Sequence, residues 1–162
     1  VLNTILSDEI FKIAPLGAVI RHEFLKETNI QFVGQSGQLP KKELITTAFK
    51  YLNTPYLWGG KSQFGIDCSG FVQQVFKLCG INLPRDAYQQ VEVGQTLAFD
   101  QLQEGDLAYF GKDRITHVGI VLKNKKIIHA HGFVRINSYD EKGILKDNLE
   151  NYSHLAISYK RI

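Results

Sequence analysis

The sequence lacks several features that would narrow its class at once. It contains no methionine, one tryptophan, four prolines and two cysteines among 162 residues. Two cysteines are too few for a disulfide framework of the kind that holds small secreted domains together. No apolar run approaches the roughly 18 residues that a membrane-spanning helix requires, so we expect no membrane span.

Residues 1–20 contain no basic start followed by an apolar run, so no signal peptide is visible. Since the sequence does not begin with methionine, we expect a mature or trimmed piece whose targeting segment is absent. The net charge is +3, and the only cluster of lysines lies at residues 123–126. This scattered, mildly basic pattern predicts no nucleic-acid partner, and it leaves the oligomeric state open.

A length of 162 residues predicts one ordinary domain, or one domain with a small appendage. Hydrophobic residues make up 44% of the chain and charged residues 22%, which is typical of soluble globular proteins. The appendage is predicted at residues 1–37. Short apolar runs at 10–13, 18–20 and 30–33 are interrupted there by Pro15 and by glycines 17, 34 and 37. This pattern predicts short strands and turns, as in a β-rich arm, ahead of a main domain at residues 38–162.

The first half of the main domain is predicted to be helical. Apolar residues recur at helical spacing over 41–52 and predict a helix there, which Pro55 is expected to end. A loop with three glycines follows at 56–65. A second helix is expected to begin after Asp67, which could cap it, and to end at Gly80. A short helix is predicted at 84–91.

The second half is predicted to be a meander of antiparallel strands. Residues rich in valine, isoleucine, tyrosine and phenylalanine predict strands at 107–110, 117–122, 126–131, 133–136 and 155–160. Residues 123–125 would form a hairpin turn between two of them. Helices followed by antiparallel strands predict an α+β fold.

Cys68 is the candidate nucleophile, because it lies at the start of the predicted second helix. The helix dipole and free backbone N–H groups stabilise a thiolate at that position and could also form an oxyanion hole. Cys79 lies late in the same helix among apolar residues and is interpreted as a core residue. A helical rise of roughly 16 Å separates the two cysteines, too far for a disulfide.

A nucleophilic cysteine needs a base, and histidine is the usual one. His117 begins one predicted strand and His129 lies in the next, so two adjacent strands could bring their rings together. His22 and His154 are interpreted as surface residues. The competing interpretation is a zinc site formed by His117, His129, His131 and Cys68. Because no CxxC or HxxxH motif accompanies these residues, we predict no metal.

Six motifs occur in order from residue 56 onwards: YLWGG at 56–60, DCSGF at 67–71, LPR at 83–85 with a glutamine at 89, GDL at 105–107, HVGI at 117–120 and IHA at 128–130. Together they resemble the NlpC family of bacterial cell-wall cysteine endopeptidases. The resemblance implies a papain-like core, in which a helix carrying the nucleophile packs on an antiparallel sheet carrying the histidines. It also implies that residues 1–37 could be part of an SH3-like module.

The resemblance implies a role for each matching residue. Cys68 would be the nucleophile, His117 its base, His129 the group that orients the base, and Tyr56 a hydrogen-bond donor at the oxyanion site. Asp67 and Ser69 would help to hold the amino end and the carboxylate of the substrate. Trp58 is expected to pack on the core, with a substrate contact as the alternative. Arg85 could form a structural salt bridge or contact substrate. Glycines 59, 60 and 70 would serve backbone geometry.

The implied activity is hydrolysis of the D-γ-glutamyl–diamino acid bond in peptidoglycan stem peptides through a thioester, without a cofactor. The alternatives are an N-acetylmuramoyl-L-alanine amidase or an acyltransferase on the same scaffold, and a wall-binding module with an inactive site. The expected substrate places the protein in the bacterial cell envelope, periplasmic or secreted, with cytoplasmic recycling of wall fragments as the alternative. The diamino acid itself, meso-diaminopimelate or lysine, is left open.

Overall fold

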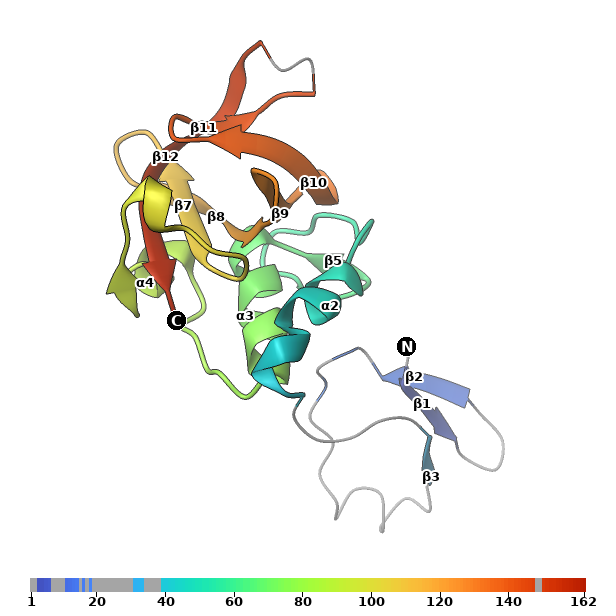
Figure 1. The fold of residues 1–162 in the computed structure, drawn as a ribbon. Helices are drawn as coiled ribbons and strands as arrows, with labels where there is room; N and C mark the ends of the chain where they lie inside the picture. Colours follow the sequence, from blue (N-terminus) through green and yellow to red (C-terminus); the bar gives the residue numbers. More distant parts are fainter. Residues whose placement is uncertain are drawn as a thin grey trace.

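The computed structural model describes residues 3–6, 11–14, 16, 18, 31–33, 39–147 and 150–162. These residues contain both helices and β-sheet, with strands predominating (Figure 1), so the α+β prediction is confirmed at that level. No helix in this described part of the chain is long and apolar enough to cross a membrane.

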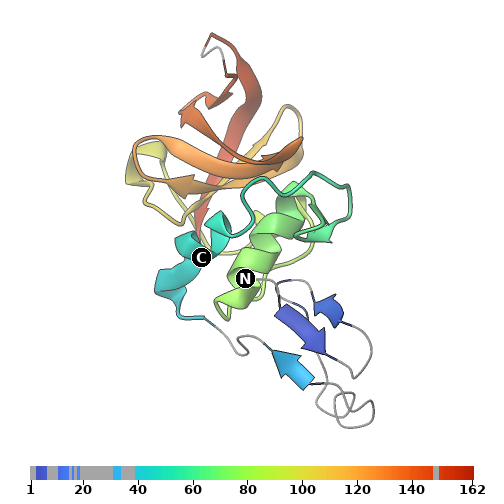
Figure 2. The same ribbon diagram turned by 90° about the vertical axis from the view of Figure 1, so that its right-hand side faces the viewer.

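A small sheet forms near the N-terminus, away from the main body of the molecule (Figures 1 and 2). Its central strand β1 (Asn3–Leu6) pairs antiparallel with β2 (Phe11–Ala14) and β3 (Gln31–Val33). β2 and β3 match the predicted runs at 10–13 and 30–33, whereas β1 was not predicted. Of the run at 18–20, only Ala18 is described, and it is in no strand; Pro15, Gly17, His22, Gly34 and Gly37 lie outside the described residues.

The helix predicted at 41–52 is shorter than expected. A 3₁₀ turn, η1 (Lys41–Glu43), leads into α2 (Leu44–Phe49), and the backbone then tightens. The N–H groups of Lys50, Tyr51 and Leu52 each bond to the carbonyl three residues earlier. Asn53 follows in the left-handed region with φ of 67°. The helix therefore ends before Pro55 is reached, because the chain turns at Asn53.

The second helix is confirmed with its predicted ends. α3 (Cys68–Leu78) begins after Asp67, whose carboxylate accepts a hydrogen bond from the Gly70 N–H at 2.7 Å. Gly80, at φ of 81°, follows the helix in the left-handed conformation that glycine adopts without strain. The short helix predicted at 84–91 is observed as α4 (Ala87–Gln90).

Seven strands form the main sheet, and every pairing between them is antiparallel. The strands are β6 (Gln95–Thr96), β7 (Leu107–Gly111), β8 (Ile115–Leu122), β9 (Lys126–His131), β10 (Phe133–Asp140), β11 (Gly143–Leu145) and β12 (Tyr152–Arg161). Their order is β11-β10-β9-β8-β7-β12-β6, and β11 also pairs with β12, so the sheet curls back on itself. The five predicted strands are confirmed, but β6 and β11 were missed. Also missed were the 3₁₀ turn η2 (Phe99–Gln101) and the small pair β4 (Lys61–Ser62) and β5 (Gly65–Ile66).

The two faces of the main sheet bury two separate cores. Leu107 and Tyr109 of β7 pack with the helices, whereas Ala108 and Phe110 point into the core that the curled strands enclose. This is the alternation expected of a strand buried on both faces. α3 packs on β8 and β9, burying Phe71 and Val75 completely between helix and sheet. This packing sets the start of α3 against the start of β8.

Candidate active site

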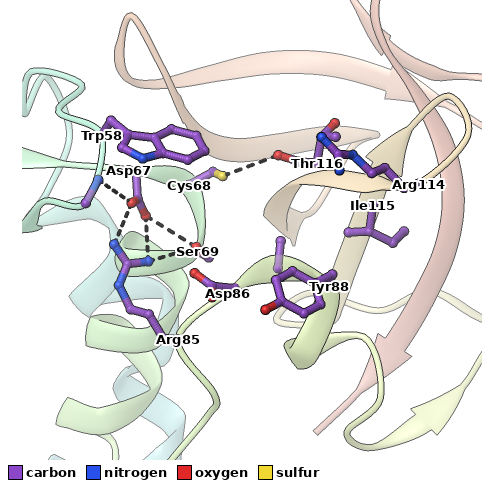
Figure 3. Close-up of a pocket in the computed structure, with 12 residues that line it drawn as sticks. Trp58, Asp67, Cys68, Ser69, Arg85, Asp86, Tyr88, Arg114, Ile115 and Thr116 are labelled. Carbon is purple, nitrogen blue, oxygen red and sulfur yellow. Dashed lines mark hydrogen bonds and ion pairs between the residues drawn. The ribbon is translucent and has the colours of Figure 1, made fainter.

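The thiol of Cys68 lies beside the main sheet, just beyond the point where the pairing of β8 with β9 ends. Cys68 is the first residue of α3, and only 6% of its surface is exposed. β8 and β9 are paired only as far as Gly119 and His129. Just beyond that pair, the Cys68 Sγ atom approaches the backbone of β8, 4.0 Å from the Thr116 carbonyl oxygen (Figure 3). The packing of α3 on the sheet thus brings the thiol to the two residues on either side of His117.

The surroundings of the thiol favour its neutral form at rest. Burial raises the pKa of Cys68, and the nearby Asp67 carboxylate raises it further. The backbone N–H groups of Val118, Ser69 and Cys68 act in the opposite direction, because they stabilise a thiolate. The net shift is upward. The N–H groups therefore support the thiolate when it forms but do not create it in advance.

A chain of three side chains begins at His117 and runs through His129 to the half-buried Asn137. His117 Nε2 lies 2.8 Å from His129 Nδ1, and His129 Nε2 lies 3.1 Å from the Asn137 side-chain oxygen. The Asn137 amide nitrogen donates to the Leu145 carbonyl at 3.3 Å and to Asp147 at 3.0 Å, which fixes the orientation of the amide. Asn137 was not singled out from the sequence, because no local motif marks it and only the pairing of β9 with β10 brings it to His129.

This chain of hydrogen bonds assigns the tautomers of both histidines. The Asn137 oxygen can only accept, so His129 Nε2 carries a proton and its Nδ1 is the acceptor for a neutral ring. His117 Nε2 must then carry the proton that it donates to His129. The Nδ1 of His117 is left with a free lone pair, which is what a general base requires.

Both histidine rings are held neutral. Burial lowers the pKa of His129 to about 3, and it lowers the pKa of His117 well below its usual value, with His129 and His154 adding to the effect. The prediction that His154 is an unremarkable surface residue is wrong. Its ring stacks on His117 with 4.1 Å between centroids, because β12 passes beside β7 at this point and brings His154 over the His117 ring.

Asp67 is the centre of a polar cluster beside the thiol. Its carboxylate accepts hydrogen bonds from the N–H groups of Gly59, at 2.8 Å, and Gly70, and pairs with Arg85 through both oxygens, at 3.0 and 2.5 Å. Arg85 also donates to Ser69 Oγ at 3.0 Å. Burial opposes ionisation of Asp67, but the bonds from Arg85 and Gly70 outweigh it and lower its pKa. The salt bridge considered for Arg85 is therefore present.

Two glycines are required by close backbone packing in this region. A Cβ atom at Gly70 would lie 2.4 Å from the Gly60 carbonyl oxygen, and one at Gly60 would lie 2.4 Å from the Gly65 carbonyl oxygen. Gly59 adopts the left-handed region with φ of 79°. The glycine-rich loop thus lies directly on the first turn of α3, as backbone geometry requires.

A cleft of about 950 Å³ opens over the thiol (Figure 3). Trp58 lines it and is 84% exposed, so the expectation that Trp58 packs on the core is wrong. The neighbouring backbone is held against β5, where the Leu57 N–H donates to the Ile66 carbonyl at 3.1 Å. Tyr88 of α4 and Arg114 and Thr116 of the β7–β8 segment line other parts of the cleft.

Tyr56 lies close enough to the thiol for the charge of Cys68 to act on its phenol. Its backbone N–H bonds to the Gly132 carbonyl at 2.9 Å, and its side chain packs on the core. Burial raises the pKa of Tyr56, and the charges of Cys68 and Asp67 raise it further. The phenol therefore remains a hydrogen-bond donor at neutral pH.

The remaining cysteine and histidine are Cys79 and His131. Both cysteines are free, and Cys79 is buried in the core between α2 and α3. His131 is exposed, with its ring centroid 6.2 Å from that of His129. Across the described ranges, no three histidine, cysteine or acidic side chains are placed to hold a metal ion.

Comparison with known proteins identifies one family. The sequence model of the NlpC/P60 family matches residues 53–152. A gamma-D-glutamyl-L-lysine dipeptidyl-peptidase of Bacillus subtilis (strain 168) is 40% identical over 111 residues, which are 62% of this chain and 38% of that protein. The murein DD-endopeptidase MepS/murein LD-carboxypeptidase of Escherichia coli (strain K12) is 43% identical over 77 residues, 46% of this chain and 41% of that protein.

A solved structure of an NlpC/P60 family protein from Bacillus cereus ATCC 10987 has the same fold. It superposes with a TM-score of 0.64 at 29% identity, covering 84% of this chain and 45% of that chain. This chain thus spans less than half the length of each of these three relatives.

Proposed function

The chain belongs to the NlpC/P60 family, and on that premise we propose that residues 38–162 form a papain-like cysteine endopeptidase domain acting on peptidoglycan. The bond cleaved is the amide between D-γ-glutamate and the diamino acid of a stem peptide. The observation that carries this proposal is the thiol at the start of α3, set against the strand whose His117 is held by His129 and Asn137. The names of the relatives support the substrate class.

The first step is attack by Cys68 on the scissile carbonyl. Since burial keeps both the thiol and His117 neutral, the proton passes from Sγ to the free Nδ1 of His117 as the C–S bond forms. The imidazolium then lies against His129 Nδ1, which accepts a hydrogen bond from its Nε2. The backbone N–H of Cys68 and the hydroxyl of Tyr56 stabilise the oxyanion.

The second step returns the enzyme to its resting state. His117 gives its proton to the leaving amine of the diamino acid, and a thioester of the glutamyl group remains on Cys68. The same histidine then takes a proton from water, whose oxygen attacks the thioester; the C–S bond breaks, the acid leaves, and His117 returns the proton to Cys68 Sγ. Asp67, Arg85 and Ser69 hold the acyl half of the substrate in this scheme, with Asp67 acting mainly by positioning Arg85 and the first turn of α3. We place the reaction in the cell envelope, because peptidoglycan lies there.

Replacement of each cysteine in turn tests the mechanism. Cys68→Ala is expected to lower the release of free amines from purified peptidoglycan by about a thousandfold or more. Cys79→Ala is the matched control, since it removes the other buried free thiol, and it should keep activity within a few fold. Mass spectrometry of the products identifies the bond. Equal digestion by wild type and Cys68→Ala would contradict the proposal, and binding of peptidoglycan without hydrolysis would favour a binding module.

A further inference from the structure

Among the described residues, two charged side chains of the cleft form no ion pair. The charged residues that line it are Asp67, Arg85, Asp86 and Arg114. Asp67 and Arg85 neutralise each other in a paired salt bridge. The Arg114 side chain makes no hydrogen bond or ion pair with any residue of the described ranges, and it is exposed to solvent. Asp86 pairs with no cation of these ranges either, but it follows Arg85 directly and its charge acts on Arg85. Arg114 is therefore the cationic side chain that the described part of the cleft leaves unpaired.

Arg114 lies on the β8 side of the thiol. It comes two residues before Thr116, whose carbonyl oxygen is 4.0 Å from Cys68 Sγ. Two residues of extended chain span about 7 Å, so an arginine side chain can reach back to the neighbourhood of the thiol. Figure 3 shows the Arg114 side chain extending alongside Thr116 on that side of the cleft.

The polar cluster of Asp67, Ser69 and Arg85 lies on the opposite side of Cys68 (Figure 3). A substrate whose carbonyl carbon contacts Sγ must extend in both directions from it. In the proposed function the cluster holds the acyl half, so the leaving diamino acid extends over the start of β8 towards Arg114. The inference that follows rests on that proposed function.

The diamino acids found in stem peptides differ at the group that would meet Arg114. The side chain of lysine ends in an ammonium group alone, whereas that of meso-diaminopimelate ends in a carbon bearing both an ammonium and a carboxylate. From bond lengths, this distal carboxylate lies on the order of 8 Å from the scissile carbon. A guanidinium pairs with a carboxylate through two parallel hydrogen bonds and repels an ammonium.

We propose that Arg114 is a specificity-determining residue that binds the distal carboxylate of meso-diaminopimelate in the leaving-group side of the cleft. The domain accordingly prefers stem peptides with meso-diaminopimelate over those with lysine. The pair forms at an exposed site, so its contribution is moderate, and the preference is expected to be about tenfold to a hundredfold in kcat/KM.

Four synthetic tripeptides test this preference: L-Ala-γ-D-Glu followed by meso-diaminopimelate or by L-lysine, each with a free or an amidated α-carboxyl group. The amidated pair isolates the distal carboxylate. Wild type should cleave the amidated meso-diaminopimelate peptide about tenfold or more faster than the lysine one. Arg114→Gln should abolish most of this ratio, and Arg114→Lys should give an intermediate ratio. Lys112→Gln is the matched control, since it removes an exposed charge of the same loop that does not line the cleft.

Two results would overturn the assignment. The first is an equal loss with both amidated peptides in Arg114→Gln, which would mean that Arg114 does not read the distal group. The second is an effect seen only when the α-carboxyl is free, which would assign Arg114 to that carboxylate instead.

A binding measurement separates a failure of this proposal from a failure of the proposed function, because it does not depend on catalysis. Calorimetry with Cys68→Ala, which retains the cleft, compares the affinities of the amidated peptides, and Cys68→Ala combined with Arg114→Gln should lose the difference. If wild type cleaves neither peptide, the endopeptidase assignment fails. The affinity ratio then still decides for or against Arg114.

Discussion

Lowering the pH from 7 to 5 is expected to destabilise the fold through His129. Burial lowers the pKa of this ring to about 3 in the folded protein, against roughly 6.5 in the unfolded chain. The unfolded state therefore binds a proton first as the pH falls. The stability contributed by the neutral ring is complete above the unfolded pKa and is lost progressively as the pH falls towards the folded pKa.

The size of the effect follows from the two pKa values. Between pH 7 and pH 5 the unfolded chain takes up about 0.7 of a proton at this position, while folded His129 takes up almost none, which costs about 2 kcal/mol of unfolding free energy. His117 and His154 add to the loss in the same direction, because burial also lowers their pKa, that of His154 to about 4. Carboxylates such as Asp67 contribute little in this window, since they titrate mainly below pH 5.

Urea denaturation followed by far-UV circular dichroism at the two pH values measures this loss. Wild type should lose about 2 kcal/mol or more, and His129→Gln, which cannot titrate, should lose about 2 kcal/mol less than wild type. Circular dichroism is the suitable probe, because the single tryptophan is 84% exposed and reports poorly on the core. Equal pH-dependent losses in the two proteins would refute the reasoning.

Two further substitutions test the groups around the base. His154→Ala removes the ring stacked on His117 and admits water, so the pKa of His117 should rise. The acid limb of the pH profile of kcat/KM should then move to higher pH, with a smaller shift in His154→Phe. An acid limb that stays in place would contradict this. Asn137→Leu removes the acceptor that fixes the His129 tautomer and should lower kcat by about tenfold to a hundredfold. The exposed control Asn151→Leu should leave kcat unchanged. Equal kcat values in the two variants would count against a role for Asn137.

Much of the fold could be predicted because its signals are local. The apolar spacing over α3, the cap at Asp67 and the stop at Gly80 all lie within residues 67–80, and all three were confirmed. The long strands carry dense β-branched and aromatic residues and were also predicted. Two-residue strands such as β6 and the short β11 carry no such signal, since only their partners in the sheet define them. Whether residues 1–37 form part of an SH3-like module stays a prediction.

The candidate site divides in the same way. Cys68, His117 and His129 could be named because each lies in an ordered motif at the start of a helix or on a strand. The stacking of His154 on His117 and the bond from Asn137 to His129 could not be named. His154 is 37 positions along the chain from His117, and its contact depends on the long-range pairing of β12 with β7.

Neighbouring residues alone specify the reactive groups of this protein: a thiol at a helix start, two strand histidines and a glycine-rich loop. The arrangement of these groups follows from the tertiary fold. It pairs Arg85 with Asp67, exposes Trp58, stacks His154 on His117 and leaves Arg114 unpaired in the cleft. Burial and charge pairing depend on segments far apart in the chain, and no local pattern records them.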